Sequence, residues 1–356
     1  MTLLPRQAIA LELHRRLDAI LAQGFSGRFI SGPETTHPFI HKYTDGFATD
    51  FGARLGNYIG NYGYLQDEVE LADTIQRFHK HADGIEYSPD EIMVAAGSSA
   101  LILGIMTFLR QHNVRSVHYF LPIYHTFYFL ADQLDIALLP LCDKPLWENA
   151  AIPTLPGGQQ VLLFADPIWC AGRAVGDATI ETVSRWQDRT GSTVIVDGTF
   201  QYLRWPGLRN KERSAELNRD HTIRLICPTK SLALHGIRFA YLLGPARILK
   251  SIRWTCDNVM GSVSAFDMCS AGKVMRVLSS PEGNRSLIEH VRARYSELRA
   301  IGYIERTIVE PDCGYYVFGK VSRAEKADLF MDRRYFELTG PDDLVRINVL
   351  SPHIFV

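Results

Sequence analysis

The sequence of 356 residues lacks the features of a membrane protein, a disulfide-stabilised protein and a nucleic-acid-binding protein. No apolar run approaches the roughly 20 residues that a membrane-spanning helix needs. The net charge of −1 gives no electrostatic reason to expect nucleic acid or an anionic membrane as a partner. None of the six cysteines belongs to a Cys-x-x-Cys pair, so neither a zinc site nor a disulfide framework is indicated. We therefore expect a cytoplasmic protein with no metal, membrane or nucleic-acid partner.

The N-terminal region has no signal-peptide pattern. In residues 2–24 the apolar positions recur at helical spacing and are interrupted by Arg, Glu and Asp, which predicts an amphipathic helix. The composition, 46% hydrophobic and 22% charged, is ordinary for a soluble globular protein, and the length is sufficient for two domains. We predict a large domain over residues 46–250. A small domain is expected from residues 1–45 and 251–356, including the N-terminal helix.

Between about residues 90 and 245, short apolar runs alternate with longer amphipathic stretches, as βαβ units do. The pattern predicts an α/β fold with a mostly parallel sheet sandwiched by helices and the ligand at one edge of the sheet. Residues 246–275 read as one long helical segment and residues 286–302 as another helix. Strand-like runs follow at residues 307–311, 314–321 and 344–350. These later elements suit a small α+β lobe.

Two charged residues stand at the ends of predicted strands. The run from Val194 to Asp197 reads as a buried strand that ends in a carboxylate, and the run from Leu225 to Lys230 as a second strand that ends in an amine. A carboxylate and an amine so placed can hold a pyridine ring. Pyridoxal 5'-phosphate needs both, because the lysine forms its Schiff base and the carboxylate keeps its ring nitrogen protonated. Arg238, eight residues after the lysine, is then expected to meet the phosphate.

Taken in order, these motifs resemble the fold-type I pyridoxal-phosphate enzymes, specifically the class I/II aminotransferase group. In that family, a small-residue turn after a strand binds the cofactor phosphate at a helix start, and Gly97, Ser98 and Ser99 match it. A proline, one residue and a ring-stacking aromatic come next, which assigns stacking to Tyr124. A family tyrosine reaches across a dimer interface to the partner's phosphate, and Tyr62 is the matching residue.

The resemblance extends to Arg346 and covers most of the chain. Arg346 matches the family arginine that binds the substrate α-carboxylate, and its planar fork suits a bidentate clamp. The resemblance also implies that Lys230 is the catalytic base. It further implies a homodimer with shared active sites, with an amino acid and, in transamination, a 2-oxo acid as substrates.

Two positions depart from the family pattern. Trp169 stands where the family has an asparagine, and Phe200 replaces a tyrosine. Both family residues donate hydrogen bonds to the phenolic oxygen of the cofactor, so two donors are missing together. The indole N–H of Trp169 is a donor that can restore one bond. Tyr202, two residues beyond Phe200, is expected to point to the same face of a strand and to offer another.

Three functions remain open from the residues and the resemblance. The first is an aminotransferase-like enzyme that acts at the α-carbon of an amino acid through aldimine and quinonoid intermediates. The second, which the departures favour, is a pyridoxal-phosphate-dependent lyase, cyclase or oxidase of specialised, arginine-type amino-acid metabolism. The third is a cofactor-binding protein without turnover, and the presence of Lys230 argues against it.

Overall fold

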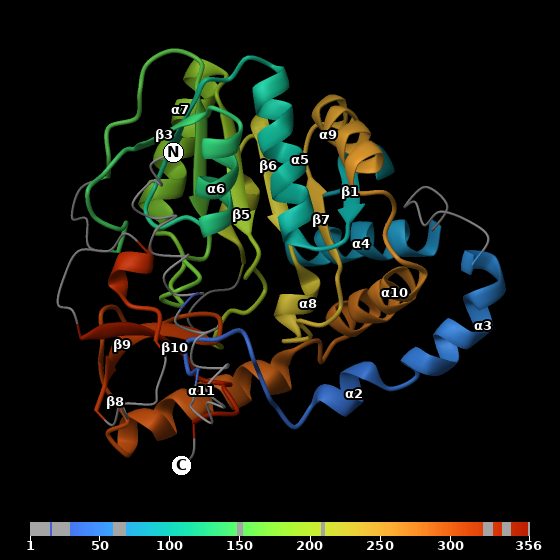
Figure 1. The fold of residues 1–356 in the computed structure, drawn as a ribbon, viewed down its shortest axis with the longest axis vertical. Coiled ribbons are helices and arrows are strands. Elements are labelled where there is room, and N and C mark those ends of the chain that lie inside the picture. The colour runs from blue at the N-terminus through green and yellow to red at the C-terminus, as the bar shows by residue number, and fades with distance from the viewer. Residues whose placement is uncertain are drawn as a thin grey trace.

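The computed structural model of the protein describes Arg15 and residues 29–59, 69–147, 152–207, 211–322, 330–336 and 343–354. These residues build a seven-stranded sheet flanked by helices and a separate three-stranded sheet (Figure 1). The predicted α/β fold is therefore confirmed. Tyr62 and, apart from Arg15, the predicted N-terminal helix lie outside the described residues. No helix within the described ranges is long and apolar enough to cross a membrane.

The large sheet has the strand order β1-β7-β6-β5-β4-β2-β3. Strand β7 runs antiparallel to both of its neighbours, and the other neighbouring pairs are parallel. The carboxyl ends of six strands therefore meet at one edge of the sheet. The strands are β1 (Ile92–Ala95), β2 (Ser116–Tyr119), β3 (Ala137–Pro140), β4 (Val161–Ala165), β5 (Thr193–Gly198), β6 (Thr222–Ile226) and β7 (Ala240–Leu243).

The central strands are continuous apolar runs because both faces of the sheet are covered. Every residue of β4 and β6 is buried. Alternate side chains enter two separate cores: Val194 and Val196 pack on one side of the sheet, and Ile195 packs on the other.

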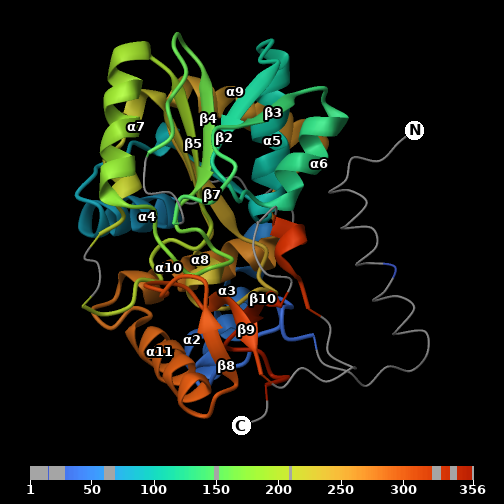
Figure 2. The ribbon, with the colours of Figure 1, turned by 90° about the vertical axis from the view of Figure 1, so that its left-hand side faces the viewer.

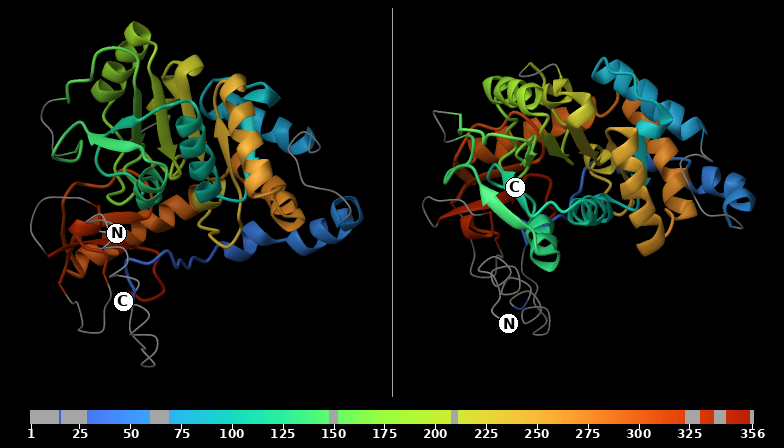
Figure 3. Two further views of the ribbon diagram at one scale, coloured as in Figure 1. Left: turned by 45° about the horizontal axis from the view of Figure 1, so that its top comes forward. Right: turned by 90° about the horizontal axis from the view of Figure 1, so that it is seen from above.

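Helices cover both faces of the sheet, as Figures 2 and 3 show. The first core contains side chains of α4 and α7, and the second those of α5, α6 and α9. The helices up to α8 are α2 (Ile40–Thr44), α3 (Phe47–Ile59), α4 (Val69–Ala82), α5 (Ser98–Gln111), α6 (His125–Gln133), α7 (Asp177–Thr190) and α8 (Pro228–Ser231). Single 3₁₀ turns occur at η2 (Pro89–Glu91), η3 (Arg213–Glu216) and η4 (Arg219–His221).

The prediction of one long helix over residues 246–275 is wrong. The chain forms two helices, α9 (Ala246–Val259) and α10 (Ala265–Ser279). Gly261 lies between them at φ +73°, in the left-handed region that ends helices. The Oγ atom of Ser264 then accepts a hydrogen bond from the backbone N–H of Asp267 at 3.1 Å and caps α10.

The small sheet has the order β10-β9-β8 and is antiparallel. It lies below the large sheet in Figure 1, next to α11 (Arg285–Ala300). Its strands are β8 (Ile304–Thr307), β9 (Tyr316–Val321) and β10 (Leu344–Asn348), with the 3₁₀ turn η5 (Arg333–Phe336) before β10. The strand predicted at residues 307–311 is misplaced, because β8 ends where that prediction begins.

The segment that begins at Phe29 is held beside β10. The backbone N–H of Asn348 donates to the carbonyl of Ile30 at 3.0 Å, and the Asn348 amide donates to the carbonyl of Glu34 at 2.8 Å. Residues about 315 positions apart therefore lie together, and the first described segment reaches the edge where the strands of the large sheet end.

Candidate active site

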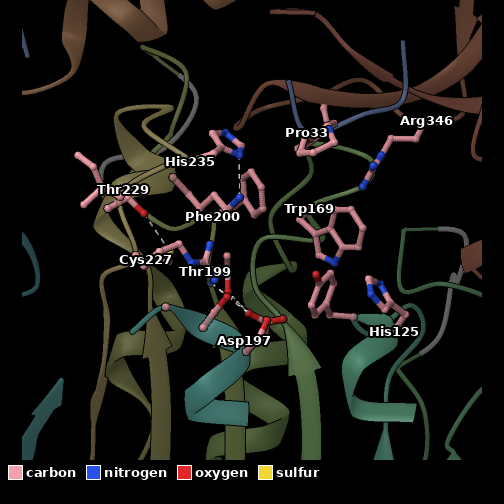
Figure 4. A pocket seen from close by; sticks show the side chains of 18 of the residues that line it. Pro33, His125, Trp169, Asp197, Thr199, Phe200, Cys227, Thr229, His235 and Arg346 are labelled. Atoms are coloured by element: carbon pink, nitrogen blue, oxygen red, sulfur yellow. Dashed lines mark hydrogen bonds between the residues drawn. The ribbon is translucent and has the colours of Figure 1, made fainter. Parts of the chain in front are cut away.

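A cavity of about 340 Å³ lies at that edge, between the large sheet and the small lobe. All the predicted site residues except Tyr62 line it: Gly97, Ser98, Ser99, Tyr124, Trp169, Asp197, Lys230, Arg238 and Arg346. Figure 4 shows Asp197 at the end of its strand on one side and His235 and Arg346 on the opposite side. The structure thus brings together residues that are up to 249 positions apart (346 − 97).

Asp197 is the penultimate residue of β5 and is buried. Burial raises the pKa of its carboxyl group, and hydrogen bonds from Thr199 act in the opposite direction. The backbone N–H of Thr199 donates to Oδ1 at 3.2 Å and its hydroxyl donates to the same atom at 2.5 Å. Within the described residues, no hydrogen bond to Oδ2 is found. A cationic N–H group in the cavity would therefore both pair with the carboxylate and offset its burial.

Lys230 lies in α8, a single helical turn that begins with Pro228 directly after β6. Burial lowers the pKa of the Lys230 amine, and the charges of Arg238 and Arg346 lower it further, although Cys227 acts in the opposite direction. A lysine with a lowered pKa carries its lone pair at a lower pH than a surface lysine, so it is a better nucleophile and base.

The N-terminus of α5 forms another wall of the cavity. Gly97 caps this helix at φ +90°, a backbone conformation that suits glycine. A Cβ atom at this position would lie 2.6 Å from the Nη2 atom of Arg238. The Arg238 backbone N–H donates to Asp267 at 2.8 Å, which ties this residue to the start of α10. A helix N-terminus with an adjacent guanidinium group is a suitable site for a phosphate.

Arg346 lies on β10 and is buried against aromatic rings. Its Cζ atom is 4.9 Å from the ring centre of Trp169 and 4.5 Å from that of Tyr316. Its Nε donates to the carbonyl of Ser31 at 3.1 Å, and its Nη2 contacts that carbonyl and the sulfur of Met331. Nη1 has no hydrogen-bond partner among the described residues. A bidentate grip on a carboxylate would use Nη1 and would replace the weak sulfur contact of Nη2.

Trp169 and Phe200, the two departures from the family pattern, lie together. Their rings are stacked with centroids 6.3 Å apart and an interplanar angle of 19°. The Nε1 atom of Trp169 is buried without a hydrogen-bond partner among the described residues. A buried donor without a partner destabilises the fold unless a ligand satisfies it. The indole N–H is therefore a donor without an acceptor in a ring that lines the cavity.

The expectation for Tyr202 is wrong. Strand β5 ends at Gly198, and Tyr202 follows in a turn at φ +65°, so the alternation of a strand no longer sets its direction. Its hydroxyl donates to Asp83 at 2.8 Å and lies 3.0 Å from an Nη2 of Arg224. Tyr202 therefore belongs to a buried polar cluster away from the cavity and cannot replace the missing tyrosine.

Several residues of the site escaped the sequence reasoning. His125 follows Tyr124 directly, and its Nδ1 lies 2.8 Å from the hydroxyl of Tyr335. His235, five residues after Lys230, lies between Lys230 and Tyr315. Proximity to the predicted lysine was the only signal for His235, and none pointed to Tyr315 or Tyr335. Phe29, Pro33 and Met331 also line the cavity.

The described part of the chain contains no cluster of His, Cys, Asp and Glu side chains that could hold a metal ion. All six cysteines are free thiols.

The family model for aminotransferase class I and II matches residues 48–339. The chain belongs to the aminotransferase class I and II family. Members of this family are transferases that typically use pyridoxal phosphate. A comparison with curated protein sequences found no match.

Solved structures of other proteins share the fold. An aspartate aminotransferase from Thermotoga maritima is 16% identical, with a TM-score of 0.76 over 96% of this chain and 92% of that chain. YbdL from Escherichia coli, described with a methionine aminotransferase function, is 16% identical, with a TM-score of 0.75 over 93% and 92%. BacF from Bacillus subtilis is 14% identical, with a TM-score of 0.78 over 99% and 94%. At these identities the likeness shows the family fold alone.

The cavity fits the cofactor that this family typically uses. It offers a buried carboxylate with an unused oxygen, an amine of lowered pKa and a helix N-terminus beside an arginine. The unpartnered Nε1 of Trp169 adds a donor for an oxygen atom. These groups match the ring nitrogen, aldehyde, phosphate and phenolic oxygen of pyridoxal phosphate in kind.

Proposed function

We propose that this protein is a pyridoxal-phosphate-dependent aminotransferase that acts at the α-carbon of an amino acid and uses a 2-oxo acid as the second substrate. The observation that carries the proposal is the cavity that contains both the Lys230 amine and the buried Asp197 carboxylate. When bound, the cofactor supplies an electron-accepting ring that stabilises negative charge at the substrate α-carbon.

Each of the chain's own groups has a role in this proposal. Asp197 would accept a hydrogen bond from the protonated ring nitrogen. Because Asp197 is buried, its carboxylate is unfavourable without such a positive partner. The N-terminus of α5 at Gly97, Ser98 and Ser99, together with Arg238, binds the phosphate. Tyr124 would stack on the cofactor ring, and Trp169 would offer its N–H to an oxygen.

Lys230 moves the proton in this scheme. Its lowered pKa increases the fraction of the amine that carries a lone pair on Nζ at a given pH, and in that form the amine can accept the α-proton of the substrate and return it to another atom of the bound molecule. Arg346 orients the substrate by donating from Nη1 to its α-carboxylate, and the aromatic rings packed on its guanidinium group keep that group in place.

The lining also bears on the substrate side chain. Asp197 is the only carboxylate among the described lining residues, which also include Phe29, Pro33, Met331 and Tyr335. A cationic side chain such as that of arginine would find no acidic partner there. We therefore infer an uncharged, apolar or aromatic side chain.

A second function is favoured by one specific observation. Trp169 and Phe200 occupy the positions of two oxygen-binding family residues, and only Trp169 still has a donor. A changed environment for that oxygen suits a lyase, cyclase or oxidase that uses the same cofactor. This alternative shares the first chemical step, the removal of the α-proton by Lys230.

We also propose a homodimer with shared active sites. Support comes from the match of Tyr62 to a family tyrosine that crosses the dimer interface. Large apolar side chains exposed on α9, Trp254 at 74% and Val259 at 66%, offer a surface that a second copy can cover.

The test combines spectroscopy with a substrate screen. The purified protein should bind pyridoxal phosphate with visible absorbance that shifts when amino acids are added, and a screen of the common amino acids plus ornithine should release a 2-oxo acid. Spectral change without oxo-acid release would favour the lyase, cyclase or oxidase. A colourless protein that binds no cofactor would refute both functions.

A further inference from the structure

Three side chains form an unbroken hydrogen-bond chain at one end of the cavity. The Nζ atom of Lys230 lies 2.8 Å from Nδ1 of His235, and Nε2 of His235 lies 2.8 Å from the hydroxyl of Tyr315. Tyr315 is fully buried, directly before β9 in the small lobe. The chain therefore links the lysine at the end of the large sheet to a phenol of the other lobe.

The buried phenol determines the direction of these hydrogen bonds. Within the described residues, the only partner of the Tyr315 hydroxyl is Nε2 of His235. If Nε2 carried the proton and donated, the phenolic hydrogen would be buried without an acceptor, at a cost of roughly 1–3 kcal/mol. The phenol therefore donates, and Nε2 accepts.

The direction of the Tyr315–His235 hydrogen bond also determines which hydrogen bond His235 can form with Lys230. Burial lowers the pKa of His235 to about 3, with Lys230, Arg238, His37 and Arg346 acting in the same sense, so the ring is neutral and carries one proton. Since Nε2 accepts, that proton resides on Nδ1, which faces Lys230. An N–H group can donate to an uncharged amine, which has a lone pair, but not to an ammonium group, which has none.

We propose that Tyr315 and His235 act as a positioning pair that holds Lys230 in its uncharged, lone-pair-bearing form. This inference rests on the proposed function, in which Lys230 accepts the α-proton. The pair itself exchanges no proton with the substrate. It selects one protonation state of the amine and orients its lone pair.

The charged and titratable groups around the pair support the same state. Arg238, from the segment after α8, and Arg346, from β10, both disfavour a positive charge on Lys230. His37, from the segment before α2, donates from Nε2 to the carbonyl of Leu232 at 3.2 Å and accepts from the N–H of Phe39, so it is neutral. Cys227, before α8, acts in the opposite direction on Lys230. Asp197, on β5, is the one carboxylate among the described residues that line the same cavity.

The proposal is tested on the full-length chain with its cofactor removed. Acetic anhydride modifies uncharged amines, and the rate of acetylation at Lys230, measured by peptide mass spectrometry across a pH series, yields the pKa of that lysine. Tyr315→Phe frees Nε2 to carry the proton, so Nδ1 can accept from an ammonium group. We expect the pKa of Lys230 to rise by about one unit, which lowers its labelling rate tenfold at pH values well below that pKa.

Two further variants separate hydrogen-bond direction from packing. Glutamine at position 235 keeps a carbonyl acceptor for Tyr315 and an N–H donor for Lys230, so His235→Gln should retain the low pKa. Tyr295→Phe removes a part-buried hydroxyl that contacts Glu310 at 3.2 Å and is not part of the hydrogen-bond chain at Lys230, so it should leave the Lys230 pKa unchanged. An unchanged Lys230 pKa in folded Tyr315→Phe protein, or equal rises in Tyr315→Phe and His235→Gln, would overturn the proposal.

The tautomer can also be observed directly. In protein labelled with ¹⁵N in its histidine rings, the signal lost in His235→Gln identifies His235 among the 12 histidines. We expect a protonated Nδ1 and an unprotonated Nε2, and the opposite tautomer would overturn the proposal even if a variant fails to fold. Because both measurements use cofactor-free protein, a failure of the proposed function would appear separately, as an absence of cofactor binding.

Discussion

Gly97 meets two constraints that no other residue type satisfies together. Its φ of +90° is unfavourable for residues with a Cβ atom, and that atom would collide with the guanidinium group of Arg238. The glycine thus allows the arginine to approach the N-terminus of α5. This contact brings two of the anion-binding groups proposed above into one place.

We expect Gly97→Ala to weaken pyridoxal-phosphate binding at least tenfold, because Arg238 has to move away from the helix N-terminus. An alanine at φ +90° and ψ 169° should also lower the free energy of unfolding by about 1–3 kcal/mol, because this region is essentially limited to glycine. Cofactor titration followed by absorbance, together with urea unfolding, measures both effects. Gly302→Ala is the matched control, since Gly302 has φ +72° with no atom within 4 Å of its missing Cβ. It should lose similar stability and no cofactor affinity.

Lys230→Ala should remove the covalent link to the cofactor while the fold remains intact, because the buried residues of α8, Pro228, Thr229 and Ser231, are unchanged. Borohydride reduction of the natural protein followed by peptide mapping should place the cofactor on Lys230. A label on any other lysine refutes the assignment. Circular dichroism of the variant verifies that the fold is retained.

Helix α4 is attached to the large sheet by a buried polar cluster. Asp83, just after the helix, lies 2.9 Å from Arg224 of β6 and 2.8 Å from His79 of α4. Tyr241 of β7 and Tyr202 complete the cluster, with the Tyr241 hydroxyl 2.7 Å from Nε2 of His79. Burial alone would raise the pKa of the Asp83 carboxyl group, but Arg224 and His79 outweigh it and lower the pKa.

Asp83→Asn should therefore lower the free energy of unfolding by about 3 kcal/mol, because it leaves Arg224 buried without its counter-charge. Since folding lowers the pKa of Asp83, its stabilisation is fully present above its unfolded pKa of about 4 and is lost as the pH falls toward the folded value. Urea unfolding should show that the natural protein loses more stability below about pH 4 than the variant does.

Asp73→Asn is the control on the same helix, because the Asp73–Arg77 pair at 2.9 Å is exposed. Its cost should be below about 1 kcal/mol. Equal losses in the two variants would contradict the assignment of a buried charge pair as the anchor of α4.

At the scale of the whole molecule, the cavity depends on contacts between distant segments. The large sheet supplies Asp197 and Lys230, the small sheet supplies Arg346, and the segment after Phe29 supports Arg346 through the carbonyl of Ser31. Neither lobe alone contains all of these groups. A second copy, if it contributes Tyr62, would complete the site from outside the chain.

We expect a homodimer in sedimentation experiments, and Trp254→Glu should raise its dissociation constant about thirtyfold, since a buried aromatic anchor is worth roughly 2 kcal/mol. Ile301→Glu is the control, because Ile301 is also exposed, at 47%, but follows α11 at the far end of the molecule from α9 (Figure 1). A monomer with full activity at high dilution would overturn the shared-site proposal, and a Trp254→Glu protein that dimerises normally would exclude this face of α9.

The sequence by itself determined the α/β fold, the family and the placement of Asp197, Lys230 and Arg238 at one edge of the sheet. Each of these depends on local patterns: buried runs make the strands, and parallel strands bring their carboxyl ends to the same edge. The break between α9 and α10 also depends on local residues, Gly261 and the Ser264 cap. It was not predicted because the apolar periodicity continues on both sides of it.

Only the tertiary structure decided how the side chains meet. Tyr202 turned away from the cavity because strand β5 had ended and a left-handed turn set its direction. The contact of Arg346 with Ser31, and the chain from Lys230 through His235 to Tyr315, join residues 315 and 85 positions apart (346 − 31 and 315 − 230). No local pattern encodes such contacts, because they form only when packing of the two lobes has closed long loops and excluded water from the groups between them.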